Sequence, residues 1–144
     1  MSTATSASRV ELKIPSRAEF ISVVRLAVAA VGTRMGFNYD DIEDLKVAVG
    51  EALTNAIQHA ETRGPAVDEI IVVCTIEPRA LVVEVCDKGE GFDPEARRRE
   101  LEEGELQEGG LGLLLIETLM DEVGFQTKPG EGTLVRMIKR LPEP

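Results

Sequence analysis

The chain of 144 residues is long enough for one folded domain and too short for two of ordinary size. Hydrophobic residues make up 43% of it and charged residues 29%, and no apolar run approaches the roughly 20 residues of a membrane span, so we expect a soluble globular protein that does not insert into membranes. Acidic residues outnumber basic ones 26 to 16, and the net charge of -10 repels a phosphate backbone, which argues against nucleic acid as a partner.

The N-terminal residues and the two cysteines indicate a cytosolic location. Residues 1–8 are small and hydroxylated and have no apolar core, so we expect a flexible tail rather than a signal peptide, followed by a single domain over residues 9–144. Cys74 and Cys86 belong to no CxxC pair and have no zinc spacing. They are predicted to be reduced thiols that act as small hydrophobic side chains.

The N-terminal elements are a strand and a helix. Apolar and charged residues alternate over 10–14, which predicts a strand covered on one side. Ser16, with Glu19 three positions later, predicts a capping box that opens a helix running to about Met35. Gly36 is then expected to end this helix.

A second helix and a loop follow. Asp40 with Glu43 repeats the capping pattern, and apolar residues recur at helical spacing over 42–60. Residues 62–68 contain a Gly-Pro pair and are predicted to form a loop.

Two apolar runs, 69–76 and 80–87, predict a hairpin with its turn at 77–79. If Ile76 pairs with Leu81, alternation places Cys74 and Cys86 on opposite faces, where no disulfide can join them. The face predicted to be covered then carries Ile70, Val72, Cys74, Ile76, Leu81, Val83, Val85 and Asp87.

The C-terminal part contains a long loop, a helix and two strands. Residues 88–112 are rich in glycine and charge, which predicts a mobile loop of unusual length. Helical spacing returns over 111–120, and strands are expected at 123–126 and 133–138. This order predicts an α+β fold, a two-layer sandwich with helices on one face of a mixed, mostly antiparallel sheet.

Glu51, Asn55 and His59 form the first group with possible chemistry. Residues four apart on a helix share one side, so these three make a polar stripe along the apolar face. A carboxylate and an amide one turn apart can hold a hydroxyl group and a hydrated magnesium ion. The alternative is an ordinary solvated helix edge, with His59 as a packed, hydrogen-bonded residue.

The second group is the segment 87–92, at the end of the second hairpin strand. Asp87 falls on the covered face, where a carboxylate is costly unless it receives hydrogen bonds. Gly89 and Gly91 allow a flat ligand to approach the backbone closely. A simple turn after the strand is the alternative, although a turn alone would not need the buried acid.

The third group is the glycine-rich segment 109–113, which runs into the predicted helix. Free N–H groups and the positive end of the helix dipole make such a start an anion site. The chain has no GxxxxGK[ST] sequence, and no GxGxxG follows the first strand, so the two common nucleotide-binding folds are disfavoured.

Together the three groups resemble the N, G1 and G2 boxes of the GHKL ATPase superfamily, with its Bergerat ATP-binding fold. Segments 47–56 and 110–123 look most like the free-standing serine-protein kinases of the RsbW and SpoIIAB type, which are anti-sigma factors. The resemblance extends over residues 10–141.

The resemblance implies a role for each matching residue. Asp87 would accept a hydrogen bond from the adenine amino group, supported by Thr133. Asn55 would bind magnesium, and Glu51 would be the catalytic base for a serine hydroxyl. Gly110 and Gly112 would contact phosphates through their N–H groups. The full set of other implied ATP-binding residues is Gly89, Gly91, Gly109, Gly110, Gly112 and Leu113.

Residues 93–108 match the ATP lid of that family. Arg97, Arg98 and Arg99 lie in this segment, and one of them could reach the γ-phosphate. Their alternative role is a helical surface run paired with neighbouring glutamates.

The resemblance implies a cytoplasmic, ATP- and Mg²⁺-dependent serine-protein kinase. Its implied partners are a sigma factor, which it sequesters, and an anti-sigma-factor antagonist of the STAS type, which it phosphorylates; a homodimer is also implied. The alternative is a non-catalytic ATP-binding module that regulates a protein partner, against which Glu51 argues. A detached histidine-kinase domain is a poor fit, because the single histidine, His59, lies inside the first motif.

Overall fold

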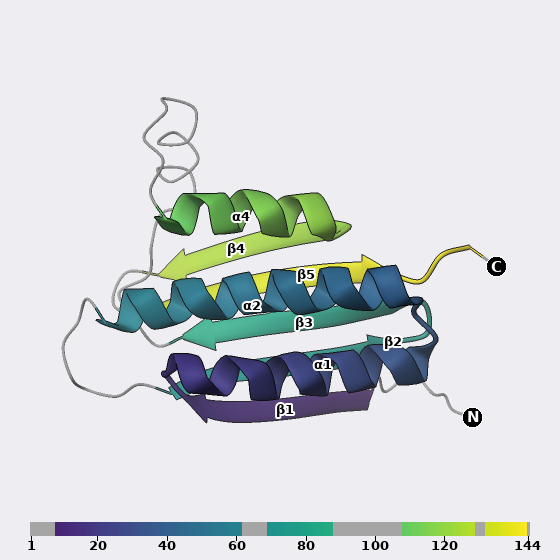
Figure 1. Ribbon diagram of the computed structural model, residues 1–144, viewed down its shortest axis with the longest axis horizontal. Coiled ribbons are helices and arrows are strands. Elements are labelled where there is room, and N and C mark those ends of the chain that lie inside the picture. Colours follow the sequence, from purple (N-terminus) through teal and green to yellow (C-terminus); the bar gives the residue numbers. More distant parts are fainter. Residues whose placement is uncertain (1–7, 62–68, 88–107, 129–131, 144) are drawn as a thin grey trace.

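The computed structural model describes residues 8–61, 69–87, 108–128 and 132–143, which form two layers. Three helices cover one face of a five-stranded sheet (Figure 1). The strand order is β1-β2-β3-β5-β4, and each neighbouring pair is antiparallel. The elements are β1 (Ser8–Pro15), a 3-10 turn η1 (Ala18–Phe20), α1 (Ile21–Met35), α2 (Tyr39–Glu61), β2 (Glu69–Glu77), β3 (Ala80–Asp87), α4 (Glu108–Leu119), β4 (Glu122–Lys128) and β5 (Gly132–Arg140).

The predicted two-layer α+β sandwich is therefore confirmed. The predicted strands at 123–126 and 133–138 correspond to β4 and β5, each somewhat longer than expected. The predicted loop at 62–68 and residues 88–107 of the predicted loop at 88–112 lie outside the described residues, whereas residues 108–112 are helical and not the loop that was predicted. Among the residues that the structure describes, no helix combines the length and the apolar character that a membrane crossing requires.

The register of the β2–β3 hairpin is the predicted one. Ile76 is opposite Leu81, and Asp87 is opposite Ile70 at the other end of the pair. The inner side chains of both strands are buried beneath the helices, together with inner residues of β5 such as Val135 and Met137. Burial of this apolar face drives the two layers together.

The start of α1 differs from the prediction. Ser16 and Glu19 form no capping box, because Arg17 donates its N–H to the Pro15 carbonyl and turns the chain into η1. The Ser16 hydroxyl is buried with no hydrogen-bond partner among the described residues. The Glu19 carboxylate pairs instead with Arg17, at 3.3 Å.

The end of α1 is the predicted one. Gly36 adopts a left-handed conformation with φ 96°, which residues with a Cβ rarely adopt. Its N–H donates to the Thr33 carbonyl, and the N–H of Phe37 donates to that of Gly32. These two bonds satisfy the last carbonyls of the helix.

The cap of α2 is Asn38 rather than the predicted Asp40. The Asn38 side-chain oxygen accepts a hydrogen bond from the N–H of Asp41 at 2.8 Å, so the helix begins at Tyr39. Asp40 and Asp41 then lie in the first turn, where carboxylates are favourable near the positive end of the dipole.

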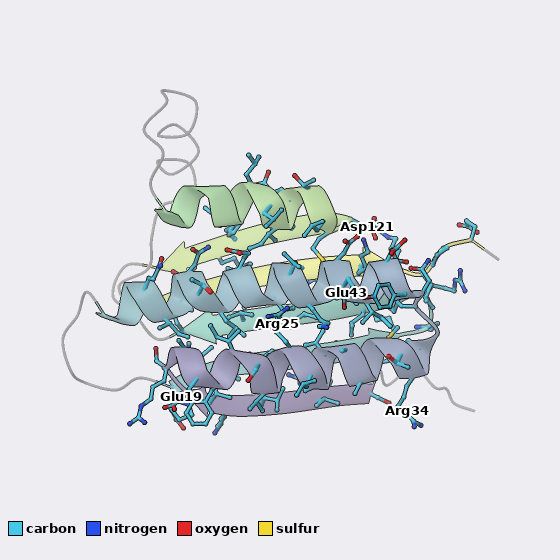
Figure 2. All side chains as sticks on the ribbon, viewed as in Figure 1. Glu19, Arg25, Arg34, Glu43 and Asp121 are labelled. Carbon is cyan, nitrogen blue, oxygen red and sulfur yellow. The ribbon has the colours of Figure 1, made fainter. Side chains whose placement is uncertain are left out.

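Helix α2 is the central helix of its layer and contacts α1, α4 and β3. Its side toward the sheet is fully buried, as at Leu45, Val49 and Leu53. Arg25 lies between α1 and α2 (Figure 2), where a Cβ added to Gly50 would be 3.5 Å from the Arg25 Cδ. The central position of α2 places one of its edges against α4.

Neither cysteine forms a disulfide, and the two lie on opposite faces of the sheet as predicted. Cys74 is completely buried among core side chains, whereas Cys86 is half-buried on the face away from the helices. Burial raises the pKa of the Cys74 thiol from its ordinary value of 9.0 to about 11.

This pKa shift predicts a loss of stability in alkaline solution. The folded-state pKa exceeds the unfolded-state value. The contribution of the neutral, buried Cys74 thiol to the free energy of unfolding is therefore complete below pH 9 and declines as the pH rises toward 11. Between pH 8 and pH 10, urea titration in reductant should show the wild type losing about 1 kcal/mol more unfolding free energy than Cys74→Ala. Equal losses in the two proteins would contradict the shift.

Candidate functional site

Asp87 and Thr133 lie directly opposite each other at one end of the sheet, where β3 finishes and β5 begins. Both side chains are on the helix-covered face and are buried, with exposed fractions of 4% and 3%. The register that aligns the core residues of β3 and β5 therefore also brings these two polar side chains together.

The Thr133 hydroxyl is an orphaned polar atom. Its Oγ1 is buried and has no hydrogen-bond partner among the described residues. A buried polar group without a partner costs free energy, and native proteins seldom retain one unless water or a ligand satisfies it. A ligand with a polar edge, such as a purine base, fits this position beside the Asp87 carboxylate.

Glu51 and Asn55 lie on the edge of α2 that faces α4. A Cβ built on Gly112 of α4 would be 2.8 Å from the Glu51 Oε2. It would also be 3.5 Å from the Asn55 Nδ2 and 3.6 Å from the Asn55 Oδ1. The structure thus places the predicted carboxylate and amide together, against the glycine-rich start of α4.

Helix α4 begins at Glu108, three residues before the predicted start at Leu111. Glycines have a low helix propensity, so the packing of α4 against α2 is what keeps this glycine-rich segment helical. Gly109 and Gly110 occupy the first turn, where N–H groups have no intrahelical acceptor and the dipole is positive. Gly112 lies in the next turn, where helical geometry directs its N–H toward a carbonyl four residues earlier.

All these groups lie at one end of the two-layer structure. The C-terminal part of α2, the first turn of α4, the end of β3 and the start of β5 share the left side of Figure 1. A polar position within the apolar layer and a helix N-terminus therefore lie at the same end of the fold.

Some predicted site residues cannot be placed. Gly89 and Gly91, the lid residues 93–107 and the side chain of His59 lie outside the described part of the chain. Leu113 is described and is buried, with an exposed fraction of 5%.

Lys139 was not singled out from the sequence, although it is a buried charge close to α4. Its Nζ donates to the carbonyl of Leu119 at 2.7 Å, and it lies 3.5 Å from the Asp44 Oδ2 and 3.8 Å from the Asp41 Oδ1. The ammonium group thus binds the C-terminal end of α4 and the first turns of α2 together. The alternation along β5 could have indicated it, because Lys139 follows Met137 by two positions on the inner face.

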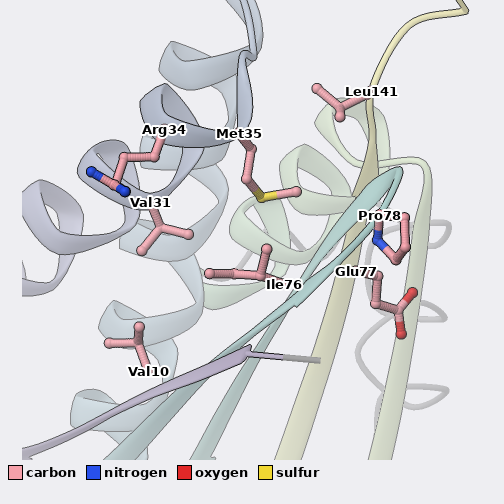
Figure 3. Close-up of a pocket in the computed structure, with 8 residues that line it drawn as sticks. All are labelled: Val10, Val31, Arg34, Met35, Ile76, Glu77, Pro78 and Leu141. Atoms are coloured by element: carbon pink, nitrogen blue, oxygen red, sulfur yellow. The ribbon is translucent and has the colours of Figure 1, made fainter. Parts of the chain in front are cut away.

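A cavity of about 450 Å³ lies away from these groups, at the opposite end of the sheet (Figure 3). Its lining is largely apolar, with Arg34 and Glu77 as the charged members. None of the predicted site residues that the structure describes lines it. The lining consists of Val10, Val31, Arg34, Met35, Ile76, Glu77, Pro78 and Leu141.

Comparisons with known proteins agree with this geometry. The histidine kinase-like ATPase domain family matches residues 14–139, which include the described elements from the end of β1 to β5. The serine-protein kinase RsbW of Bacillus velezensis is 44% identical over 147 residues, covering 95% of this chain and 88% of that protein. RsbW of Bacillus subtilis is 41% identical over 143 residues, covering 94% and 88% of the two chains.

The chain belongs to the RsbW family of serine-protein kinases. The predicted resemblance is thereby confirmed, including the use of ATP that the ATPase domain entails. The fold has a counterpart in the crystal structure of the RsbU and RsbW domains of a Mycobacterium tuberculosis protein, with a TM-score of 0.70 and 19% identity. That match covers 95% of this chain and 33% of the other, and it supports the RsbW-type fold.

Membership of an ATP-using family gives a direct prediction for Asp87. If Asp87 accepts a hydrogen bond from the purine, as the resemblance implies, replacing it by asparagine should weaken ATP binding about 10- to 150-fold, or roughly 1.5 to 3 kcal/mol, because the charge-assisted bond is lost. Isothermal titration calorimetry measures the change. The matched control is Glu84→Gln, which alters a carboxylate on the other face of the same strand. Similar affinities for Asp87→Asn and the control would contradict this role.

Proposed function

We propose that this RsbW-family chain is an anti-sigma factor that transfers the γ-phosphate of ATP to a serine of an anti-sigma-factor antagonist and otherwise sequesters a sigma factor. The observation that carries the proposal is the meeting of Glu51 and Asn55 with the start of α4, at the same end of the sheet as Asp87 and Thr133. Residues 9–144 would act as one nucleotide-binding unit.

Nucleotide binding in this proposal uses two kinds of contact. Asp87 accepts a hydrogen bond from the adenine amino group, and the Thr133 hydroxyl gains the partner that it lacks among the described residues. The N–H groups of Gly109 and Gly110, with the dipole of α4, stabilise the negative charge of the phosphates. The purine and the phosphates are thereby held at a fixed separation.

Glu51 is proposed as the general base. The serine oxygen forms a bond to the γ-phosphorus, the bond between that phosphorus and the bridging oxygen of the β-phosphate breaks, and ADP leaves with that oxygen. The hydroxyl proton passes to the Glu51 carboxylate. A carboxylate at the edge of α2 suits this role because Glu51 is half-buried and still accessible to a partner protein.

Replacing Glu51 by alanine should lower phosphotransfer about 10²- to 10⁴-fold, the usual contribution of a positioned general base. The measurement is transfer of labelled γ-phosphate from ATP to a purified antagonist protein. Glu43→Ala serves as the matched control, because Glu43 lies on the same helix and pairs with Lys46 on the surface. Equal transfer by Glu51→Ala and the wild type would remove Glu51 from this role.

Asn55 is proposed as the protein ligand of Mg²⁺. Its amide oxygen lies beside Gly112 at the phosphate end of the site, and magnesium in nucleotide complexes takes few protein ligands besides phosphates and water. The ion would neutralise charge on the transferring phosphate.

Asn55→Ala should therefore raise the Mg²⁺ concentration needed for half-maximal phosphotransfer by about tenfold or more, since one oxygen ligand is lost. A magnesium titration at saturating ATP measures this shift. An unchanged midpoint would show that Asn55 is not a ligand. Asn38→Ala is a suitable comparison, because Asn38 caps the other end of the same helix.

The partners and the location extend the proposal. An antagonist of the STAS type, a sigma factor, a homodimeric assembly and a cytoplasmic location are all consistent with membership of the RsbW family. Affinity capture from the native cytosol with and without ATP tests the partners, and sedimentation equilibrium tests the assembly. If neither a sigma factor nor an antagonist is recovered, with ATP or without it, the anti-sigma role is contradicted.

A further inference from the structure

We propose that Gly112 is a positioning residue for the catalytic carboxylate. The bare backbone of α4 at this glycine is the surface against which the Glu51 carboxylate rests, and one methyl group at that position moves the carboxylate away from the reacting serine. The inference rests on the proposed role of Glu51 as the general base, and it assigns Gly112 a steric task besides the phosphate contact that the resemblance implies.

Backbone conformation does not explain this glycine. Gly112 lies within α4, and the glycines with positive φ in the described ranges are Gly36 and Gly132. An alanine would adopt the backbone of Gly112 without strain and would favour a helix more strongly. The position therefore requires glycine for its lack of volume.

Phosphate binding through a backbone N–H does not require glycine either, because alanine carries the same group. Because α4 begins at Glu108, the N–H of Gly112 reaches a carbonyl one turn earlier in the helix. Gly109 and Gly110 lie in the first turn, where the N–H groups have no acceptor within the helix. Substituting Gly112 by alanine changes neither of those groups.

Contact with Glu51 does explain it. An added Cβ would lie 2.8 Å from the Glu51 Oε2, closer than non-bonded carbon and oxygen atoms approach. The distances to the Asn55 amide, 3.5 and 3.6 Å, are ordinary contacts. The carboxylate is the free end of a flexible side chain, so it moves while α4 stays. The fold tolerates the methyl group, and the position of the proposed base changes.

The chain offers a matched control on α2. Gly50 is also helical and is adjacent to Glu51 in sequence, and its added Cβ would lie 3.5 Å from the Arg25 Cδ and 3.8 Å from its Nε. Gly50→Ala therefore adds the same methyl group next to the same glutamate, without entering the space of the carboxylate.

The first test separates nucleotide binding from catalysis. Gly112→Ala should lower kcat for transfer to the antagonist about 10- to 100-fold, because a displacement near 1 Å misaligns the base. The KM for ATP and the calorimetric Kd should change by less than about threefold. Gly50→Ala should retain the wild-type kcat. An unchanged kcat in Gly112→Ala, or a parallel loss of ATP affinity, would overturn the proposal.

The second test needs no activity and uses nucleotide-free protein. In a Glu51→Ala background there is room for the methyl group that Gly112→Ala adds. The substitution should therefore raise Tm by about 2 to 4 °C there, because alanine favours a helix more than glycine does. In the wild-type background the rise should be smaller, because the carboxylate is displaced. Equal rises in Tm in the two backgrounds would show that the added methyl group does not meet Glu51, and would overturn the proposal. If the wild type transfers no phosphate, the proposed function fails while this cycle still decides whether the contact exists.

Discussion

The antiparallel pairing of β3 with β5 is the constraint on which the site depends. It aligns the core side chains of the two central strands, and the same register sets Asp87 opposite Thr133 at the end of the pair. A slip of one residue would send the core of β5 to the other face and separate these two groups. The hydrophobic core therefore maintains the position of the two polar side chains that are proposed to recognise the purine.

The helix layer adds the second half of the site through close packing. Helix α2 is held on both sides, by α1 and by α4, and its polar edge at Glu51 and Asn55 meets α4 where a glycine removes the steric barrier. Larger side chains at that crossing would hold the two helices farther apart. The chemistry proposed for this family member thus depends on how closely two helices approach.

Much of this arrangement could be predicted from the sequence, because alternation and helical spacing are local. The hairpin register, the faces of both cysteines and the cap at Gly36 followed from such patterns. The wrong predictions concern helix starts, where several neighbouring residues can each form a cap or a turn. Asn38 rather than Asp40 caps α2, and the Ser16 capping box is replaced by a turn at Arg17. The early start of α4 and the contact between Gly112 and Glu51 depend on packing between distant segments, which spacing does not encode.

The ammonium group of Lys139 gives α4 two unequal ends. One end is fixed to β5 and α2 by Lys139, through its hydrogen bond to the carbonyl of Leu119 and its ion pairs with Asp41 and Asp44, and the other end begins with the glycines. The helix has 12 residues, so its first turn lies roughly 16 Å from this anchor. By simple leverage, a tilt of a few degrees about Lys139 would move the glycine end by about an ångström while the anchored end stays in place.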